Sequence, residues 1–407
     1  MFIVGRAIAG AGGSGIVSGI MTIIAHVIPL ERRAGYMAIG GSTMGISTIS
    51  GPLIGGALTQ NASWRWCFYI NLPIGALTAV ALIALFHPPV RPSEQFSLVE
   101  RIRKLDLIGA FLFTPAIVML LLALQWGGHD YDWKSATIIG LFCGSGGLFL
   151  IFVGWLSYKG DSAMIPFKLL ARRTVIANCF TSFGVFGSLF VVIYYIPEWF
   201  QVIKHASPIK SGVMNIALFV PQIIGSIIGG TLINKFGYCN PFIIAGCLFS
   251  SIAAGLFSTF TVNSDHATWI GVQVLFGLGA GFSMETPLTA AQTALSTEEA
   301  GIGVALVTFF QFIGSSIFLA LAQTIFSNRL TNALAKYAPQ VNAVTLMSLG
   351  TAAVRDFATS EELPGVLEAY NAAITSTFYV AAGASAFATL AALTCQWRSV
   401  KVKSEPS

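Results

Sequence analysis

Apolar stretches of about twenty residues, separated by short polar or glycine- and proline-rich breaks, follow one another along most of the chain. An α-helix of that length crosses the hydrocarbon core of a bilayer. The pattern therefore predicts an all-α membrane protein with eleven transmembrane helices. The expected helices lie at about 2–29, 34–58, 66–86, 107–124, 137–157, 174–196, 211–233, 241–262, 267–291, 301–326 and 372–395.

The composition agrees with a chain embedded in lipid. Hydrophobic residues make up 55% of the 407 residues and charged residues only 10%, whereas a soluble domain carries about 25% charged residues. The five histidines lie at span ends or in loops, and the six cysteines form no CxxC pair. We therefore expect no metal, no cofactor, no nucleic-acid partner and no enzymatic activity, with the lipid bilayer as the surroundings.

The distribution of basic residues predicts the orientation of the chain. One alternate set of loops, which includes Arg32, Arg33 and the C-terminal tail, holds twice as many lysines and arginines as the other set. Basic residues are retained on the cytoplasmic side of a membrane. The C-terminus is therefore predicted to be cytoplasmic and Met1 to face outward. The start of the chain has no basic leader or cleavage site, so we expect no removable signal peptide.

Two charged residues, Arg6 and Glu285, are the only ones that fall within the predicted spans. A charge in the middle of a membrane costs about 2.5 to 3.5 kcal/mol on insertion scales, so such residues are candidates for function. A carboxylate that faces a cavity can load and release protons. The structural alternative for Arg6 is that it binds carbonyl groups or extends to the membrane interface. The structural alternative for Glu285 is that it lies near the cytoplasmic end of its helix and reaches the interface.

Glycine spacing indicates an internal repeat. The segment RAIAGAGGSG, with Gly10 and Gly12, matches QVLFGLGAGF, with Gly277 and Gly279, and ERRAG then matches TEEAG at nearly the same offset. Two matching blocks predict a duplicated multi-helix unit, an arrangement found in transporters. The first three helices would then correspond to the last three.

This repeat leads to a domain scheme in which the first unit has lost its leading three helices. The complete architecture would have 14 helices, of which this chain would hold 11, so we expect an N-terminally truncated protein. The predicted parts are a remnant of the first unit at 1–86, a cytoplasmic linker with an amphipathic helix at 87–106, an inserted helix pair and cytoplasmic loop at 107–173, the second unit at 174–395 with an extracellular loop at 327–371, and a cytoplasmic tail at 396–407.

Ordered motifs give the chain a family resemblance. They are GPLIGG, WRWCFYINLPIG, YYIPEWFQ, SPIKSG and GTLINKFG, in that order along the sequence. Together with the RxxxGxG helix that starts at Arg6, they resemble the major facilitator superfamily and, within it, the 14-span drug:proton antiporters common in fungi and bacteria. The resemblance implies that superfamily's helical bundle and a transport activity without cofactors.

The same resemblance implies roles for several residues. Arg6 and Glu285 would take part in proton coupling. The antiporter motif that would govern gating comprises Gly51, Pro52, Gly55 and Gly56. The loop of the second unit that corresponds to the family's cytoplasmic gating loop comprises Gly230, Asn234, Lys235 and Gly237. Asn234 stands at a position where an acid is often found in the family. The structural alternative for the motif glycines is close helix packing without a role in gating.

Polar and aromatic residues inside the predicted helices are candidates for a substrate cavity. Aromatic residues make up 12% of the chain, and rings of this kind stack on planar organic molecules. The alternative is that the polar groups form hydrogen bonds between helices. The candidates are Asn178, Tyr194, Tyr195, Asn215, Gln222 and Gln311.

The sequence thus predicts a proton-coupled exporter of small amphiphilic organic compounds such as toxins, drugs or secondary metabolites. Its expected partners are the small-molecule substrate and protons, and we expect a monomer in the plasma membrane, with the vacuolar membrane as the alternative. Two other functions stay open at this stage. One is a siderophore or nutrient carrier of the same superfamily, and the other is a truncated product that does not transport.

Overall fold

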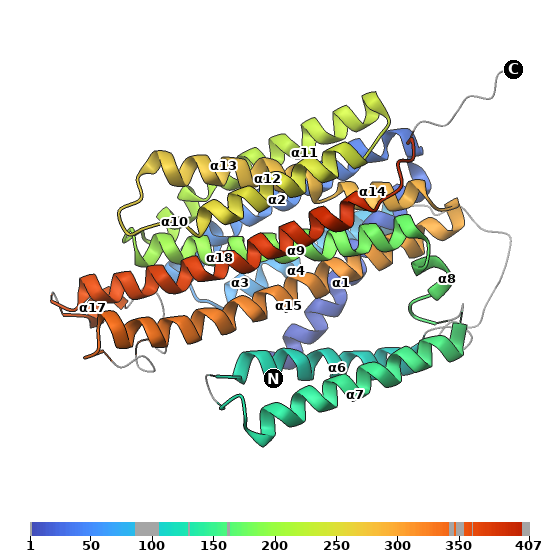
Figure 1. The fold of residues 1–407 in the computed structure, drawn as a ribbon. Coiled ribbons are helices and arrows are strands. Elements are labelled where there is room, and N and C mark those ends of the chain that lie inside the picture. The colour runs from blue at the N-terminus through green and yellow to red at the C-terminus, as the bar shows by residue number, and fades with distance from the viewer. Residues whose placement is uncertain are drawn as a thin grey trace, which may run out of the picture.

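A computed structural model gives the fold of the chain. It describes residues 2–85, 106–128, 131–160, 163–341, 346, 354–359 and 361–400. Long helices run nearly parallel through most of the molecule, and one helical hairpin is set apart along one side (Figure 1). The predicted amphipathic helix in the 87–106 linker and most of the 341–354 segment lie outside the described residues.

The helical membrane fold predicted from the sequence is confirmed, since each predicted span corresponds to a helix or a broken helix. Within the described residues, nine helical segments are long and apolar enough to cross a membrane, and α1 and α2 correspond to the first two predicted spans. The helices are α1 (Phe2–Val27), α2 (Leu30–Asn61), α3 (Trp66–Tyr69), α4 (Asn71–Leu85), α6 (Leu107–Trp126), α7 (Ala136–Lys159), α8 (Phe167–Leu170), α9 (Arg173–Val202), α10 (Pro208–Met214), α11 (Ile216–Phe236), α12 (Asn240–Phe257), α13 (His266–Ser283), α14 (Thr286–Thr293), α15 (Thr297–Tyr337), α17 (Val354–Phe357) and α18 (Leu363–Leu393).

The core of the molecule lies among α9, α11, α12, α13, α15 and α18, which pack against one another. Large aromatic side chains fill it, including the fully buried Trp199, Phe257 and Phe378. Two of its polar side chains are paired in the interior: Trp199 Nε1 donates a hydrogen bond to Asn371 Oδ1 at 2.9 Å, and Asn371 Nδ2 donates to the carbonyl of Phe260 at 2.9 Å. Pairing of this kind avoids the cost of an unsatisfied polar group away from water.

The helices at the start of the chain pack on this core over a smaller surface. α2 lies along α11 and also touches α14, while α1 contacts α15. α3 and α4 follow α2, and no residue of either helix is buried. Apolar helices with so few protein contacts leave their side chains facing lipid or further protein.

The hairpin formed by α6 and α7 is held together at the start of α6 by Asp106. The Oδ1 atom of Asp106 accepts hydrogen bonds from Gly109 N, Trp155 Nε1 and Lys159 Nζ at 2.9 to 3.0 Å, and its Oδ2 atom accepts one from Met164 N at 2.8 Å. Burial raises the pKa of this carboxyl, but these donors outweigh that effect and lower the pKa to about 2. Asp106 therefore stays ionised and caps α6 while it binds α7.

Several helix ends differ from the prediction. α9 continues to Val202, α15 continues to Tyr337, and α18 already begins at Leu363. Much of the loop predicted at 327–371 is therefore helical. The prediction differs there because hydropathy follows apolar runs, and these helices continue into more polar sequence.

The longer α9 also corrects the inventory of charges within the spans. Glu198 lies inside α9 and inside a segment suited to cross the membrane. The prediction that only Arg6 and Glu285 are charged within spans was therefore wrong.

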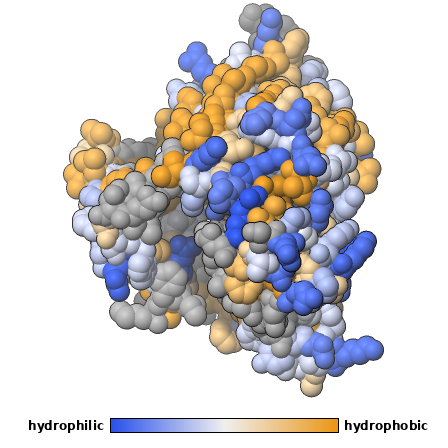
Figure 2. Space-filling view, turned by 90° about the vertical axis from the view of Figure 1, so that its left-hand side faces the viewer, coloured by the Kyte–Doolittle hydropathy of each residue, from blue (hydrophilic) through white to orange (hydrophobic). Residues whose placement is uncertain are grey.

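The end of the molecule that carries α10, α17 and the turn between α6 and α7 has a polar surface. Figure 2 looks onto this end, where hydrophilic side chains gather in the middle and hydrophobic side chains lie toward the flanks. This is the distribution expected for an end in water and sides in lipid. The opposite end holds α8, α14 and the last described residues of the chain (Figure 1).

Candidate functional site

Glu285 lies at a break between two helices. α13 ends at Ser283 and α14 begins at Thr286, with Pro287 in the first turn of the new helix. Proline has no backbone N–H to donate to the preceding turn, so α13 cannot continue straight through it. The break places the Glu285 side chain in the interior, where the residue is 9% exposed and its Oε2 atom has no hydrogen-bond partner among the described residues.

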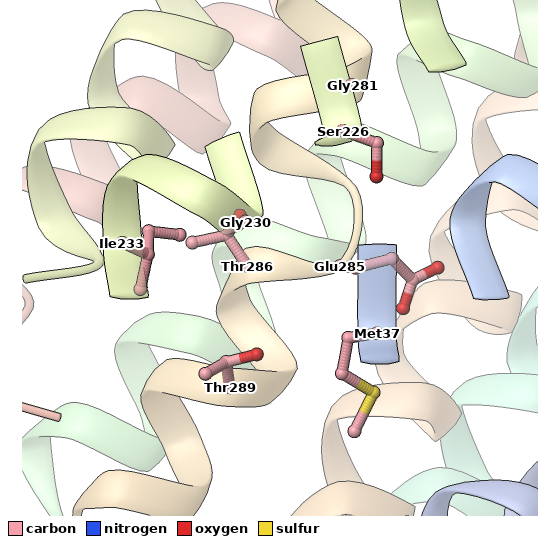
Figure 3. Close-up of a pocket in the computed structure, with 8 residues that line it drawn as sticks. All are labelled: Met37, Ser226, Gly230, Ile233, Gly281, Glu285, Thr286 and Thr289. Carbon is pink, nitrogen blue, oxygen red and sulfur yellow. The ribbon is translucent and has the colours of Figure 1, made fainter. Parts of the chain in front are cut away.

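A small cavity of about 10 Å³ adjoins this carboxylate. That volume is about the size needed for a single water molecule. Figure 3 shows Glu285 extending from the break between α13 and α14 into the space beside Met37 of α2. The cavity is lined by Met37, Ser226, Gly230, Ile233, Gly281, Glu285, Thr286 and Thr289. The cavity thus places a buried carboxylate where α2 meets α11 and the break between α13 and α14.

A second polar contact joins α2 to α14 nearby. Arg33 Nη1 donates a hydrogen bond to Gln292 Oε1 at 3.4 Å, and Arg33 Nε donates to the carbonyl of Ile28 at 2.9 Å. Gln292 lies seven positions after Glu285, so the two side chains share one face of α14 two turns apart. The sequence assigned Arg33 to a cytoplasmic loop, and no local pattern links it to a glutamine 259 positions away.

The structure does not bring Arg6 to Glu285. Arg6 is exposed on α1, with its guanidinium carbon 6.0 Å from the centroid of the Phe68 ring. It does not line the Glu285 cavity. The structure therefore shows no direct contact between the two charges.

The repeat glycines have different surroundings in the two helices that they relate. A Cβ atom at Gly277 would collide with the carbonyl oxygen of Leu218, and one at Gly279 would lie 2.7 Å from the carbonyl oxygen of Gly246. Around Gly10 and Gly12, an added Cβ would meet no described atom within 4 Å. In α13 these glycines therefore allow α11 and α12 to approach closely, whereas in α1 no such close approach is seen among the described atoms.

The glycines of the predicted antiporter motif lie in α2. An added Cβ at Gly51 or Gly55 would have no described atom within 4 Å, while the side-chain surroundings of Pro52 and Gly56 lie outside the description. Near the motif, Cys67 Sγ of α3 donates a hydrogen bond to the carbonyl of Gly55 at 3.8 Å, a contact equally compatible with gating and with plain packing.

The predicted cytoplasmic gating loop divides between two places. Gly230 lines the Glu285 cavity, and an added Cβ at Gly35 of α2 would lie 3.4 Å from Asn234 Nδ2. Gly237 ends α11 with a positive φ of 83°, a backbone conformation that favours glycine. Lys235 lies in the last turn of the same helix. Gly230 and Asn234 thus lie on the side of α11 that meets α2.

The six predicted cavity residues do not form one cavity. Tyr194 is half-exposed and lines a cavity of about 410 Å³. The other five are buried, and several already have hydrogen-bond partners within the protein. The donors and acceptors are Asn178 Nδ2 to Thr174 O, Tyr195 Oη to Gln323 Oε1, Asn215 Nδ2 to Ser211 O, and Gln222 Nε2 to Met284 Sδ, while Gln311 Nε2 has no described partner. Bonding between helices, the structural alternative, is seen for Tyr195 and Gln222, whereas Asn178 and Asn215 donate to carbonyl groups four residues earlier in the chain.

Comparisons with known proteins place this arrangement in a family. The sequence profile of the Major Facilitator Superfamily matches residues 1–319. Efflux pump roqT of Penicillium rubens is 43% identical over 399 residues, which are 98% of this chain and 74% of the relative. The MFS-type efflux pump MFS1 of Arthroderma benhamiae is 39% identical over 402 residues, which are 98% of this chain and 75% of the relative.

One further relative and one solved structure extend the comparison. The MFS-type transporter astH of Aspergillus oryzae is 43% identical over 399 residues, covering 98% of this chain and 71% of the relative. A bacterial homolog of the human lysosomal transporter Spinster, solved in an inward-facing and unoccupied conformation, aligns with a TM-score of 0.47 at 14% identity over 93% of this chain and 86% of that structure. The sequence profile and the relatives, which match nearly the whole chain, show that this protein belongs to the Major Facilitator Superfamily of membrane transporters.

Proposed function

We propose that this protein exports small amphiphilic organic compounds, such as toxins, drugs or secondary metabolites, in exchange for protons. Two of the relatives described above are named efflux pumps. The observation that carries the proton exchange is the position of Glu285, a buried carboxylate with an unpartnered oxygen beside a water-sized cavity. Substrate efflux and proton coupling are thus supported by separate observations.

In this proposal Glu285 is the group that carries the proton. An ionised carboxylate without a cation or donor on Oε2 is costly in a membrane interior, and protonation removes that cost. A water in the adjoining cavity would bring or remove the proton. When the cavity opens to bulk water, the carboxylate becomes solvated and releases the proton. The protonation of Glu285 would therefore follow the conformational state of the transporter.

The contact between α2 and α14 would link this step to the movement of helices. The Arg33 to Gln292 hydrogen bond joins the same two elements that enclose Glu285. Separation of α2 from α14 would break that bond and admit water to the carboxylate. In an alternating-access transporter, rocking of one helical unit against the other provides such a separation.

The two-unit organisation and the site assignments beyond Glu285 belong to the same proposal. The first unit would comprise α1 to α4, and the second unit would comprise α9 to α18. α6 and α7 would be the helix pair inserted between them. Arg6 would act in coupling from α1 without contacting Glu285, and the α2 motif at Gly51 to Gly56 would govern gating. We place the protein as a monomer in the plasma membrane, with a cytoplasmic C-terminus.

Flux into proteoliposomes tests the proposed exchange. With the purified chain reconstituted, an acidic lumen drives accumulation of an antiporter's substrate, whereas an alkaline lumen drives that of a proton symporter. Radiolabelled cycloheximide serves as a neutral probe and rhodamine 6G as a cationic one. We expect accumulation of at least one of them with an acidic lumen, and its loss in Glu285→Gln.

The control is Glu361→Gln, which makes the same chemical change at an exposed position just before α18. It should transport like the unchanged protein. Accumulation only with an alkaline lumen would instead indicate a siderophore or nutrient carrier driven by symport, and no accumulation of any probe under either gradient would indicate a product that does not transport.

A further inference from the structure

A second cavity lies between the α6–α7 hairpin and the core. Its volume is about 410 Å³, which falls within the range of about 300 to 1,000 Å³ typical of small-molecule sites. α6, α9 and α15 each supply part of its wall. The lining residues are Leu121, Gln125, Tyr194, Ser316, Leu319, Ala320 and Gln323. The predicted substrate residues included Tyr194 but not the two glutamines.

Hydrogen bonding and close approach fix the walls of this cavity relative to each other. Thr324 Oγ1 donates a hydrogen bond to the carbonyl of Leu124 at 2.6 Å, which ties α15 to α6 directly beside Gln125 and Gln323. Gly128 directly follows Gly127, the C-cap of α6, and has a positive φ of 75°. A Cβ atom added at Gly128 would lie 2.8 Å from Asn328 Oδ1 of α15. The hairpin is therefore docked on α15 at this level.

One amide in the cavity is held in a defined orientation. The hydroxyl of Tyr195, a residue with no exposed surface, donates a hydrogen bond to Gln323 Oε1 at 2.8 Å. Gln323 makes no other hydrogen bond with the described residues, so its Nε2 atom keeps its donors. Gln125 is exposed and likewise has no described partner, and Tyr194 adds a phenol group to the same wall. The cavity thus combines oriented donors with the apolar side chains of α6 and α15.

The wall carries no ionised side chain among the described lining residues. The nearest acidic residue along α9 is Glu198, one turn beyond Tyr194, and it interacts electrostatically with Tyr194, Tyr195 and Tyr370. Tyr370 belongs to α18, so Glu198 lies near the contact of α9 with α18 and does not line the cavity. The wall itself thus provides donors for an acceptor and holds no carboxylate that would contact a cation directly.

We propose that the cavity between α6, α9 and α15 binds a neutral organic molecule that has an apolar body and a carbonyl acceptor, with Gln323 Nε2 as the donor to that carbonyl. Tyr195 acts as a positioning residue, since its hydroxyl holds the amide without lining the cavity. The inference rests on the proposed export function and deepens it by naming the substrate class and a site that includes the inserted hairpin.

Photolabelling with benzophenone tests this site without requiring transport. Benzophenone is neutral, carries one carbonyl between two aromatic rings, and on irradiation inserts into nearby C–H bonds. With the full chain in lipid nanodiscs, we expect labelled peptides that contain residues of α6 at 121–125 or of α15 at 316–323. Excess cycloheximide should suppress the labelling, and rhodamine 6G should not.

Two variants and one control complete the experiment. Gln323→Leu should lower labelling by about fivefold, the effect of losing one hydrogen bond worth about 1 kcal/mol. Tyr195→Phe should lower it by a smaller factor and should have no further effect in the Gln323→Leu background, whereas a purely structural defect would lower labelling in both backgrounds. The control Gln273→Leu makes the same amide-to-alkyl change in α13, outside the cavity, and should label normally.

The outcomes separate this site from the proposed function. Labelling that is independent of Gln323, that maps outside these segments, or that rhodamine 6G suppresses as well as cycloheximide does would overturn the site. Normal labelling in a protein that accumulates no probe under either proton gradient would support the site and contradict the proposed exchange.

Discussion

The segment formed by α3 and α4 (Trp66–Leu85) and the helix α9 are both long and apolar enough to cross a membrane, yet their surroundings in the protein differ completely. None of the residues of α4 is buried, and Leu85 is 81% exposed. α9 buries most of its length against α15 and α18, where Gly184 and Gly187 leave no room for a side chain. Hydropathy therefore identifies a helix that enters lipid, whereas small residues at matched positions decide which helices pack closely.

The repeat glycines give the largest expected effect and test that comparison directly. Gly277→Ala places a methyl group against the carbonyl of Leu218, so α13 must move away from α11. We expect a loss of about 2 to 3 kcal/mol in stability, typical of overpacking. Gly10→Ala, its repeat counterpart in α1, should change stability very little. Thermal unfolding of the two purified variants measures the difference, and equal melting temperatures would contradict the proposed role of close packing.

The α6–α7 hairpin should show an intermediate effect that depends on pH. The pKa of Asp106 is lowered from 3.8 to about 2 in the folded protein, so its ionised form contributes roughly 2 kcal/mol of stability. Because the folded pKa is the lower one, this contribution is present above about pH 4 and disappears as the pH falls toward 2.

Asp106→Asn tests this contribution to the hairpin. The gap in melting temperature between the variant and the unchanged protein should be widest between pH 5 and 7 and should narrow below pH 4. A gap that is constant with pH would show that the carboxylate does not hold the hairpin through its charge.

The smallest effect is expected at an exposed ion pair. Arg172 Nη1 and Nη2 donate to Glu299 Oε2 and Oε1 at 2.9 and 2.8 Å, which links the start of α9 to the start of α15. Both side chains are more than a third exposed, so water and salt screen the pair. Arg172→Ala should cost less than about 1 kcal/mol, and the cost should fall further in 1 M salt. A larger loss that does not change with salt would mean that Arg172 stabilises this contact through packing of its side chain and not through its charge.

The sequence predicted the helices well and their neighbours poorly. Apolar run length follows from the thickness of the bilayer, so the spans could be placed from composition alone. Helix ends could not be placed in this way, because α15 and α18 continue into more polar sequence that an apolar-run criterion does not detect. For the same reason Glu198 was placed in a loop, although it lies within α9.

The candidate site was predicted in part. Glu285 could be recognised because a charge inside an apolar run is costly and therefore informative. Its surroundings could not be recognised, since Arg33 and Gln292 are far apart in sequence and each is ordinary in its own segment. Tyr194 was recognised as an aromatic residue in a span, but Gln323 and Gln125 acquire their role only when α6 docks on α15.

The measurement that tests the central claim most directly compares two kinds of flux in Glu285→Gln. In proteoliposomes, exchange of labelled for unlabelled substrate needs no net proton movement, whereas accumulation against a concentration gradient needs the proton gradient. Our account predicts that Glu285→Gln keeps the exchange and loses the proton-driven accumulation, together with the pH change reported by pyranine in the lumen. A variant that still accumulates substrate and moves protons like the unchanged protein would contradict the account.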